Sequence, residues 1–216
     1  MFANLSSMGS RATVTNPVRQ RNPRGEGERL RDELIAASIR LLEHHGSDKD
    51  LSLRAVAREA GVAAPSIYRH FSDMRALNRA VLDVCFDELG GYLNAAVDAA
   101  GPDPAARLRA HANAWCRFAL ERPGIYHALF GVTTSPYPDP TPEQLAGWQV
   151  FQDWVELVAD YLPPDREPAV APVIATICLW AALHGLVALR ISKPNFPWPP
   201  LDQLIDHTLA TQLGLR

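Results

Sequence analysis

Cysteine is scarce in this chain, and neither sign of charge dominates it. The 216 residues include three cysteines and carry a formal net charge of −3. Cys85, Cys116 and Cys178 are odd in number and lie far apart in apolar stretches, so we expect reduced thiols that fill the core rather than a disulfide framework. No pair of His or Cys residues has the spacing of a zinc site, and we expect no metal.

The sequence signatures of catalysis and of export are also missing. The chain has no nucleophile elbow, no glycine-rich phosphate loop and no metal-spaced histidine cluster, so we expect neither enzyme activity nor a cofactor. Residues 1–20 contain no apolar segment behind a basic start, so we expect no signal peptide and a cytoplasmic location.

The charge is divided unevenly along the chain. Residues 1–75 contain 12 Lys and Arg against 9 Asp and Glu, whereas residues 76–216 contain 9 against 15. A phosphate-binding surface is therefore expected at the N-terminal end. We divide the chain into a disordered basic arm at 1–27, a small domain at 28–75 and a larger domain at 76–216. The arm is either a solvated tail or a contact to nucleic acid, and Met8 is an alternative to Met1 as the biological start.

Apolar residues recur at helical spacing through the chain, and no segment alternates as a strand does. Caps, glycines and prolines divide this pattern into about nine helices, so the predicted fold class is all-α. Gly90 and Gly91 are expected to kink or fray the fourth helix, and the prolines between 136 and 142 predict a loop. The expected helices cover roughly residues 28–45, 53–60, 64–70, 74–93, 102–120, 124–130, 148–162, 168–189 and 201–213.

The segment from Pro168 to Leu189 contains no Asp, Glu, Lys or Arg. Its length raises the alternative of a membrane span. We reject that alternative because Pro172, Thr176 and His184 interrupt the segment and no aromatic belt or set of basic loops accompanies it. A helix that is apolar all round also fits a position between its own domain and a partner. We therefore predict a homodimer through the last two helices, with the alternative that they only complete the core of one subunit.

Residues 52–71 have the pattern of two short helices joined by a tight turn, as in a helix-turn-helix. Ser52 is a good N-cap, small Ala57 allows the helices to cross closely, and Gly61 suits the backbone angles of the turn. Apolar Ile67 and Phe71 are expected to point back to the core and hold the second helix against it. The outward residues of that helix suit a position in a DNA major groove: Ala63, Ala64, Pro65, Ser66, Tyr68, Arg69 and His70.

This motif resembles the DNA-binding domain of the TetR family of bacterial transcriptional regulators. The resemblance rests on the apolar pattern Leu34–Gly46 and on the signature Ala-x-x-x-Gly-Val…Ile-Tyr-x-His-Phe…Leu that ends at Leu77, and it covers residues 28–77. The helical remainder has the layout that this family uses for its ligand and dimer domain. The stretch Leu179–Gly185 is similar to a Trp…His-Gly pattern found in one subgroup.

The resemblance implies DNA-contact roles for individual residues. It makes Tyr68 and His70 phosphate contacts, and it makes Ser52 and Arg54 anchors to the DNA backbone. The alternatives are that Tyr68 covers the edge of the core, that His70 caps the chain locally, and that Arg54 and Arg69 are solvated surface charges.

Two features of the motif bear on how it would read DNA. The resemblance makes residues 63–66 the base-facing positions. Only small residues stand at Ala63 and Ala64, which predicts readout through thymine methyl groups, Arg69 and DNA shape. Where the family usually places a Lys in the first turn of the next helix, this chain has Met74. The usual phosphate contact is expected to be lost at this position, with the alternative that the adjacent Arg75 replaces it, although its side chain points elsewhere on the helix.

Aromatic residues are concentrated in the larger domain: Phe86, Tyr92, Trp115, Phe118, Tyr126, Phe130, Trp148, Phe151, Trp154 and Trp180. Such a set predicts a pocket for an apolar or aromatic ligand, with the alternative that each residue belongs to the core. The expected ligand-binding residues are Phe86, Trp115, Phe118, Tyr126, Phe130, Trp148, Phe151, Cys178 and His184.

The expected function is that of a TetR-like repressor, which a small apolar or aromatic ligand releases from a palindromic operator. Repression is assumed because most proteins that resemble this pattern repress. The alternative is an architectural or partner-recruiting DNA-binding protein of the same fold with no inducer. A cavity beside Trp115 and Phe151 distinguishes the two hypotheses.

Overall fold

The computed structural model describes residues 26–45, 51–131, 145–163 and 171–215, and these ranges contain α-helices and their connections but no strand. The predicted all-α class is confirmed. The expected arm up to residue 25, the alternative start at Met8, the stop at Gly46 and the proline loop at 136–142 lie outside the described residues. The described helices are α1 (Glu26–His45), α2 (Leu53–Glu59), α3 (Ala64–Ile67), α4 (Met74–Ala99), α5 (Pro104–Glu121), α6 (Pro123–Phe130), α7 (Trp148–Tyr161), α8 (Pro172–Ser192) and α9 (Leu201–Leu213).

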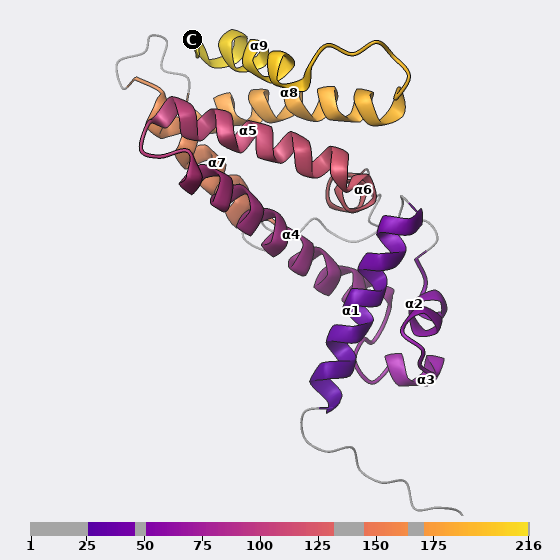
Figure 1. The fold of residues 1–216 in the computed structure, drawn as a ribbon. Coiled ribbons are helices and arrows are strands. Elements are labelled where there is room, and N and C mark those ends of the chain that lie inside the picture. Colours follow the sequence, from indigo (N-terminus) through magenta and orange to yellow (C-terminus); the bar gives the residue numbers. More distant parts are fainter. Residues whose placement is uncertain (1–25, 46–50, 132–144, 164–170, 216) are drawn as a thin grey trace, which may run out of the picture.

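The first three helices form a small unit at one end of the molecule, and α4 runs from it into the larger bundle (Figure 1). Local chemistry sets the ends of these helices. The Ser52 hydroxyl accepts a hydrogen bond from the Ala55 amide at 3.2 Å, and the Asp73 carboxylate accepts one from the Ala76 amide at 2.8 Å. Gly61 has a φ of +68° in the turn between α2 and α3, as predicted.

The larger bundle is built on α5, which packs against α4, α7, α8 and α9. Figure 1 shows α8 and α9 side by side at the end away from α2 and α3. The expected fraying of α4 at Gly90 and Gly91 is wrong, because the helix continues without interruption to Ala99. Leu89 and Leu93 on either side of the two glycines are fully buried, and this packing holds the turn in place.

A close contact between α1 and α6 joins the small unit to the bundle. A Cβ atom on Gly124 would lie 2.1 Å from the Leu42 carbonyl oxygen, so only glycine permits this approach. Beside it, Arg122 donates to Glu43 of α1 at 2.7 and 2.9 Å and also to Glu88 of α4. Burial lowers the pKa of Arg122, but its hydrogen bonds and charge interactions with these glutamates outweigh that effect and raise it.

One side of α8 is uncovered although the helix packs against α5, α7 and α9. Its mean hydropathy of 2.0 and its length would allow it to cross a membrane, and 28% of that window is buried. The exposed side carries Ile174 and Leu189, each more than half exposed. Cys178 also lies on it, so the expectation of a third core-filling cysteine is wrong. Burial raises the pKa of Cys85 to about 11 and that of Cys116 to about 12, and both remain protonated.

Candidate functional site

The surface formed by α2, α3 and the turn after α3 presents the predicted DNA contacts. Ile67 and Phe71 are 0% and 3% exposed, and they anchor this segment to the core as predicted. Tyr68 is 59% exposed, so it does not serve to cover the core edge. Of the nine predicted contacts, Ser52, Arg54, Ala63, Pro65, Tyr68 and Arg69 are exposed, and Ala64, Ser66 and His70 are half-buried.

The second helix of the motif is shorter than predicted. It ends at Ile67, and Tyr68 is its C-cap, whereas the sequence predicted helix to His70. The amides of His70 and Phe71 both donate to the Ile67 carbonyl, so residues 68–70 form a tight turn. This turn lets Phe71 enter the core and Asp73 cap α4.

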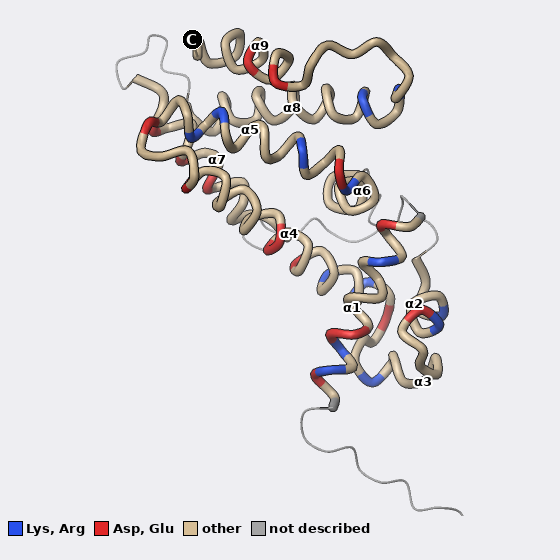
Figure 2. Tube along the Cα trace, in the orientation of Figure 1, with Lys and Arg blue, Asp and Glu red and all other residues tan. Residues whose placement is uncertain are grey.

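Unpaired basic side chains lie on this surface. Among the described residues, Arg54, Arg58 and Arg69 take part in no ion pair, whereas Arg40 of α1 pairs with Glu59 of α2 at 2.8 Å. Basic and acidic residues are interspersed on α1 and α2, and acidic residues follow along α4 (Figure 2). Free guanidinium groups of this kind suit phosphate contacts. Met74, in place of the usual Lys, is partly buried and packs against the core.

A cavity of about 540 Å³ lies in the larger bundle between α4, α5, α6, α7 and α8. Its lining within the described residues contains no titratable side chain. Five of the predicted ligand-binding residues meet there, namely Phe86, Trp115, Phe130, Trp148 and Phe151. The other lining residues are Leu129, Leu145, Ala146, Gly147, Val150, Trp154, Val173, Ile177 and Trp180.

Four predicted ligand residues do not line this cavity. Phe118 is buried beside Tyr92, with ring centroids 5.9 Å apart, and Cys178 faces outward on α8. Tyr126 and His184 form a hydrogen bond of 2.5 Å between the hydroxyl and Nδ1. Burial raises the pKa of Tyr126 and lowers that of His184, so this pair is neutral at physiological pH.

The Tyr126–His184 pair packs against Trp115 and Phe130, which both line the cavity. The ring centroid of Trp115 lies 5.4 Å from that of Tyr126 and 5.9 Å from that of Trp154. Trp154 in turn packs on buried His111 at 4.7 Å. The cavity wall is therefore one continuous aromatic cluster rather than a set of separate core stripes.

Trp154 is a cavity residue that the sequence could have assigned, whereas no sequence signal singles out Trp180. Trp154 follows Trp148 and Phe151 at intervals of three, which places all three on one side of α7. Gly147, by contrast, has its role only in space. Its φ is +80°, and a Cβ atom there would lie 2.3 Å from the Phe86 ring, so glycine lets the start of α7 approach α4.

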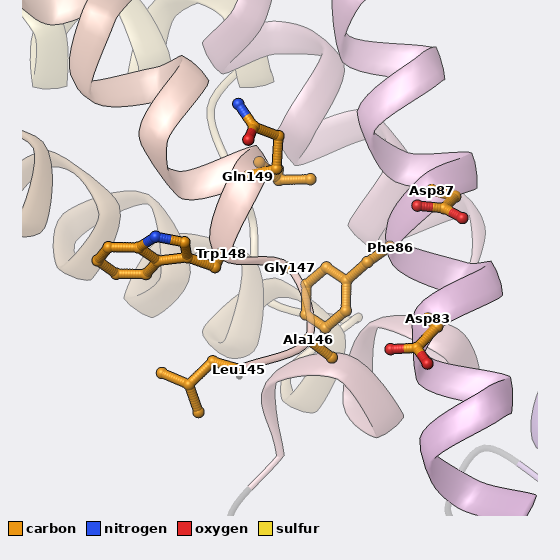
Figure 3. A pocket seen from close by; sticks show the side chains of 9 residues that line it. Asp83, Phe86, Asp87, Leu145, Ala146, Gly147, Trp148 and Gln149 are labelled. Atoms are coloured by element: carbon orange, nitrogen blue, oxygen red, sulfur yellow. The ribbon is translucent and has the colours of Figure 1, made fainter. Parts of the chain in front are cut away.

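A second cavity of about 360 Å³ adjoins the first and shares six residues with it. It adds the carboxylates of Asp83 and Asp87 and the amide of Gln149. Figure 3 shows the two aspartates on the same helix as Phe86, whose ring faces Gly147. The carboxylates of Asp83 and Asp87 therefore lie beside the aromatic cavity but do not line it.

Two family models match successive parts of the chain. Residues 34–81 match the bacterial regulatory proteins of the tetR family, and residues 108–212 match the tetracyclin repressor-like C-terminal domain. The chain is also similar to an uncharacterized HTH-type transcriptional regulator of Mycobacterium tuberculosis, with 28% identity over 186 residues. That alignment covers 86% of this chain and 78% of the relative.

Solved structures share the whole arrangement. A protein of unknown function from Rhodococcus sp. RHA1 has 27% identity and a TM-score of 0.68, and the match covers 86% of this chain and 95% of that one. The TetR-like regulator LfrR from Mycobacterium smegmatis, solved in complex with proflavine, has 20% identity and a TM-score of 0.55. That match covers 87% of this chain and 96% of LfrR. With the helix-turn-helix and the helical C-terminal domain both matched in order, this chain belongs to the TetR family of DNA-binding transcriptional regulators.

Proposed function

We propose that this regulator is a cytoplasmic homodimeric repressor, and that a small aromatic ligand in the bundle cavity releases it from a palindromic operator. The observation that carries the proposal is the cavity of about 540 Å³ beside Trp115 and Phe151. A purely architectural DNA-binding protein has no need for such a chamber, so the alternative without an inducer is not favoured. The complex of LfrR with proflavine supports a small-molecule ligand for this chain as well.

The small unit of α1, α2, α3 and the turn up to Phe71 is called the reading head. It would contact DNA through the exposed side of α2 and α3. Tyr68 and Arg69 project from the turn after α3, and Arg54 lies in the first turn of α2. We assign Tyr68, His70, Ser52 and Arg54 to the phosphates. The base-facing positions are Ala63, Ala64, Pro65 and Ser66.

Helix α4 connects the cavity to the reading head. Phe86 in the middle of α4 lines both cavities, and the first residue of α4 follows Phe71 of the reading head by only three positions. A ligand that shifts α4 would therefore change the separation of two reading heads in a dimer. A complete switch from 1:99 to 99:1 needs a differential affinity of about 10⁴, or about 5.5 kcal/mol.

The test measures binding of the full chain to the DNA upstream of its own gene. Fluorescence anisotropy monitors this binding across a salt series. Tyr68→Ala should weaken binding about tenfold, the loss of one hydrogen bond to phosphate. Tyr92→Ala is the matched control, because Tyr92 is also exposed but lies on α4 in the bundle. Equal affinities for this DNA and for random DNA, or equal effects of the two substitutions, would contradict the proposal.

A further inference from the structure

The start of α1 lies beside the turn of the reading head that we assign to DNA. A Cβ atom on Gly27 would lie 3.9 Å from Cε1 of His70, one of the assigned phosphate contacts. One turn further along α1, the guanidinium carbon of Arg31 lies 5.4 Å from the ring centroid of Phe71. Figure 1 likewise shows α1 beginning at the end of the small unit that carries α3. The residues that precede α1 therefore join the reading head next to its proposed DNA surface.

The reading head and the start of α4 lack the positive charge that is typical of a DNA-binding domain. Residues 26–75 contain 8 Lys and Arg against 9 Asp and Glu. Two of these arginines are already paired, Arg29 with Glu33 at 3.2 Å and Arg40 with Glu59 at 2.8 Å. Neutralisation of phosphates by Lys and Arg supplies essentially all of the affinity of a protein for DNA of no particular sequence. A domain without a net positive charge is a poor source of that affinity.

The segment before α1 holds the missing charge. Residues 1–25 contain no Asp or Glu and four arginines, namely Arg11, Arg19, Arg21 and Arg24. They therefore account for the whole positive excess of residues 1–75. All four arginines follow Met8, so they are present whether Met1 or Met8 is the biological start.

The arginines of this segment are within reach of DNA that is held on α2 and α3. Three residues of chain span at most about 10 Å, and six residues at most about 20 Å. Arg24 and Arg21 precede Gly27 by these numbers of residues, so they can contact phosphates next to the one assigned to His70. The two earlier arginines can extend the contact along the duplex, which presents one charge per about 1.7 Å of its axis.

From this placement and this distribution of charge we infer that residues 1–25 bind the DNA backbone beside each half-site, through phosphate contacts of their four arginines. They supply the positive charge that the reading head lacks. Residues 76–216, with 9 Lys and Arg against 15 Asp and Glu, repel DNA and do not replace this contribution. The inference rests on the proposed function, in which α2 and α3 dock on DNA.

The test replaces all four arginines with glutamine in the full chain, which keeps the length of the segment. Fluorescence anisotropy across a salt series measures binding to a random-sequence duplex and to the DNA upstream of the gene. The slope of log K against log salt concentration should fall in magnitude by about 0.9 for each lost phosphate contact, or about 3.6 for each bound reading head. Affinity at physiological salt should fall at least about tenfold. Unchanged or higher affinity on both duplexes would overturn the inference.

Two pairs of substitutions separate position from net charge. Arg21→Gln with Arg24→Gln should lower the slope by about 1.8 for each reading head. Arg107→Gln with Arg117→Gln removes the same charge from α5 in the larger bundle and should leave the slope unchanged. Arg117 is exposed and Arg107 has only a surface ion pair with Asp160 at 3.6 Å, so neither change should unfold the bundle. Equal effects of the two pairs would refute the contact by residues 1–25.

A lysine variant tests the chemistry of the contact. Arg21→Lys with Arg24→Lys keeps the charge but loses the planar guanidinium, and phosphates bind either group. This variant should therefore keep the wild-type slope. A slope as low as that of the corresponding glutamine pair would overturn the assignment to phosphates.

Tyr68→Ala distinguishes a failure of this inference from a failure of the proposed function. If Tyr68→Ala weakens binding to the upstream DNA and the arginine variants do not, α2 and α3 dock as proposed and the contact by residues 1–25 is wrong. If the arginine variants lower the slope on the random duplex but the wild type does not prefer the upstream DNA, the contact holds and the proposed operator is wrong.

Discussion

At the scale of single residues, the bundle core contains an unusual buried histidine. His111 is 1% exposed, it packs on Trp154, and its Nδ1 has no hydrogen-bond partner. Burial lowers its pKa from 6.5 to about 3. The imidazole is therefore neutral in the folded protein across the physiological range, and it acts as a polar member of an aromatic wall.

His111 should make the protein sensitive to acid. Between pH 6.5 and 3 the unfolded chain binds a proton at this position and the folded chain does not, so the free energy of unfolding falls as pH decreases. At pH 5 the loss is about 2 kcal/mol relative to pH 7.5. His111→Leu should remove this loss of stability. Urea unfolding at pH 7.5 and at pH 5 measures the free energy of unfolding of each protein. His207→Leu, at an exposed position of α9, is the control, and identical pH profiles for the two variants would refute the prediction.

At the scale of helices, the contact between α1 and α6 determines how the reading head is held on the bundle. Gly124 lies against the Leu42 carbonyl, and the neighbouring Arg122 reaches both α1 and α4. These contacts place the end of α1 at the junction of three helices. A movement of α6 or α4 in response to a ligand would therefore be transmitted to the reading head.

Gly124→Ala should destabilise this junction. The added methyl group overlaps the α1 backbone, which cannot move aside as a flexible side chain does, and we expect a loss of about 1–3 kcal/mol. Gly91→Ala is the matched control, because a Cβ atom there meets nothing within 4 Å. It should stabilise α4 by about 0.5–1 kcal/mol. Urea unfolding measures the stability change of each variant. A Gly124→Ala protein as stable as the wild type would contradict the close contact between α1 and α6.

At the scale of the whole molecule, the uncovered side of α8 is the main unpartnered apolar surface of the described chain. Ile174 at one end of α8 is 54% exposed, and Leu189 at the other end is 53% exposed. An apolar strip of this length along one helix is costly in water. The exposed residues of α9 are mostly polar, so we expect α8 to supply most of the apolar contact in a homodimer.

Ile174→Glu together with Leu189→Glu should dissociate that homodimer. Each substitution would bury an unpaired carboxylate in the interface, which is strongly unfavourable. Sedimentation velocity should show a monomer for the double variant, and its operator affinity should fall because each subunit binds only one half-site. Gln152→Glu together with Asn94→Asp adds the same charge at exposed positions of α7 and α4 and should leave the dimer intact. A wild-type protein that sediments as a monomer would contradict the predicted dimer.

The sequence alone determined the elements and the reading head of this protein. The cap at Ser52, the left-handed turn at Gly61 and the buried Ile67 and Phe71 were all predicted, and the all-α class followed from apolar spacing. These features depend on chemistry within a few residues of the chain, where hydrogen-bonding side chains, backbone angles and helical periodicity act directly. Even here the predicted end of α3 was three residues too late. The helix ends at Ile67 because Phe71 must turn into the core, which depends on tertiary packing.

Only the tertiary structure decided which side chains meet around the cavity. The aromatic composition predicted a pocket, but it did not distinguish Trp180, which lines it, from Tyr126 and His184, which hydrogen-bond to each other and do not line it. Nor did it indicate that Cys178 faces outward. The rotation and crossing of α4, α5, α7 and α8 fix these outcomes, and they result from packing among residues distant in the sequence, which no local pattern records.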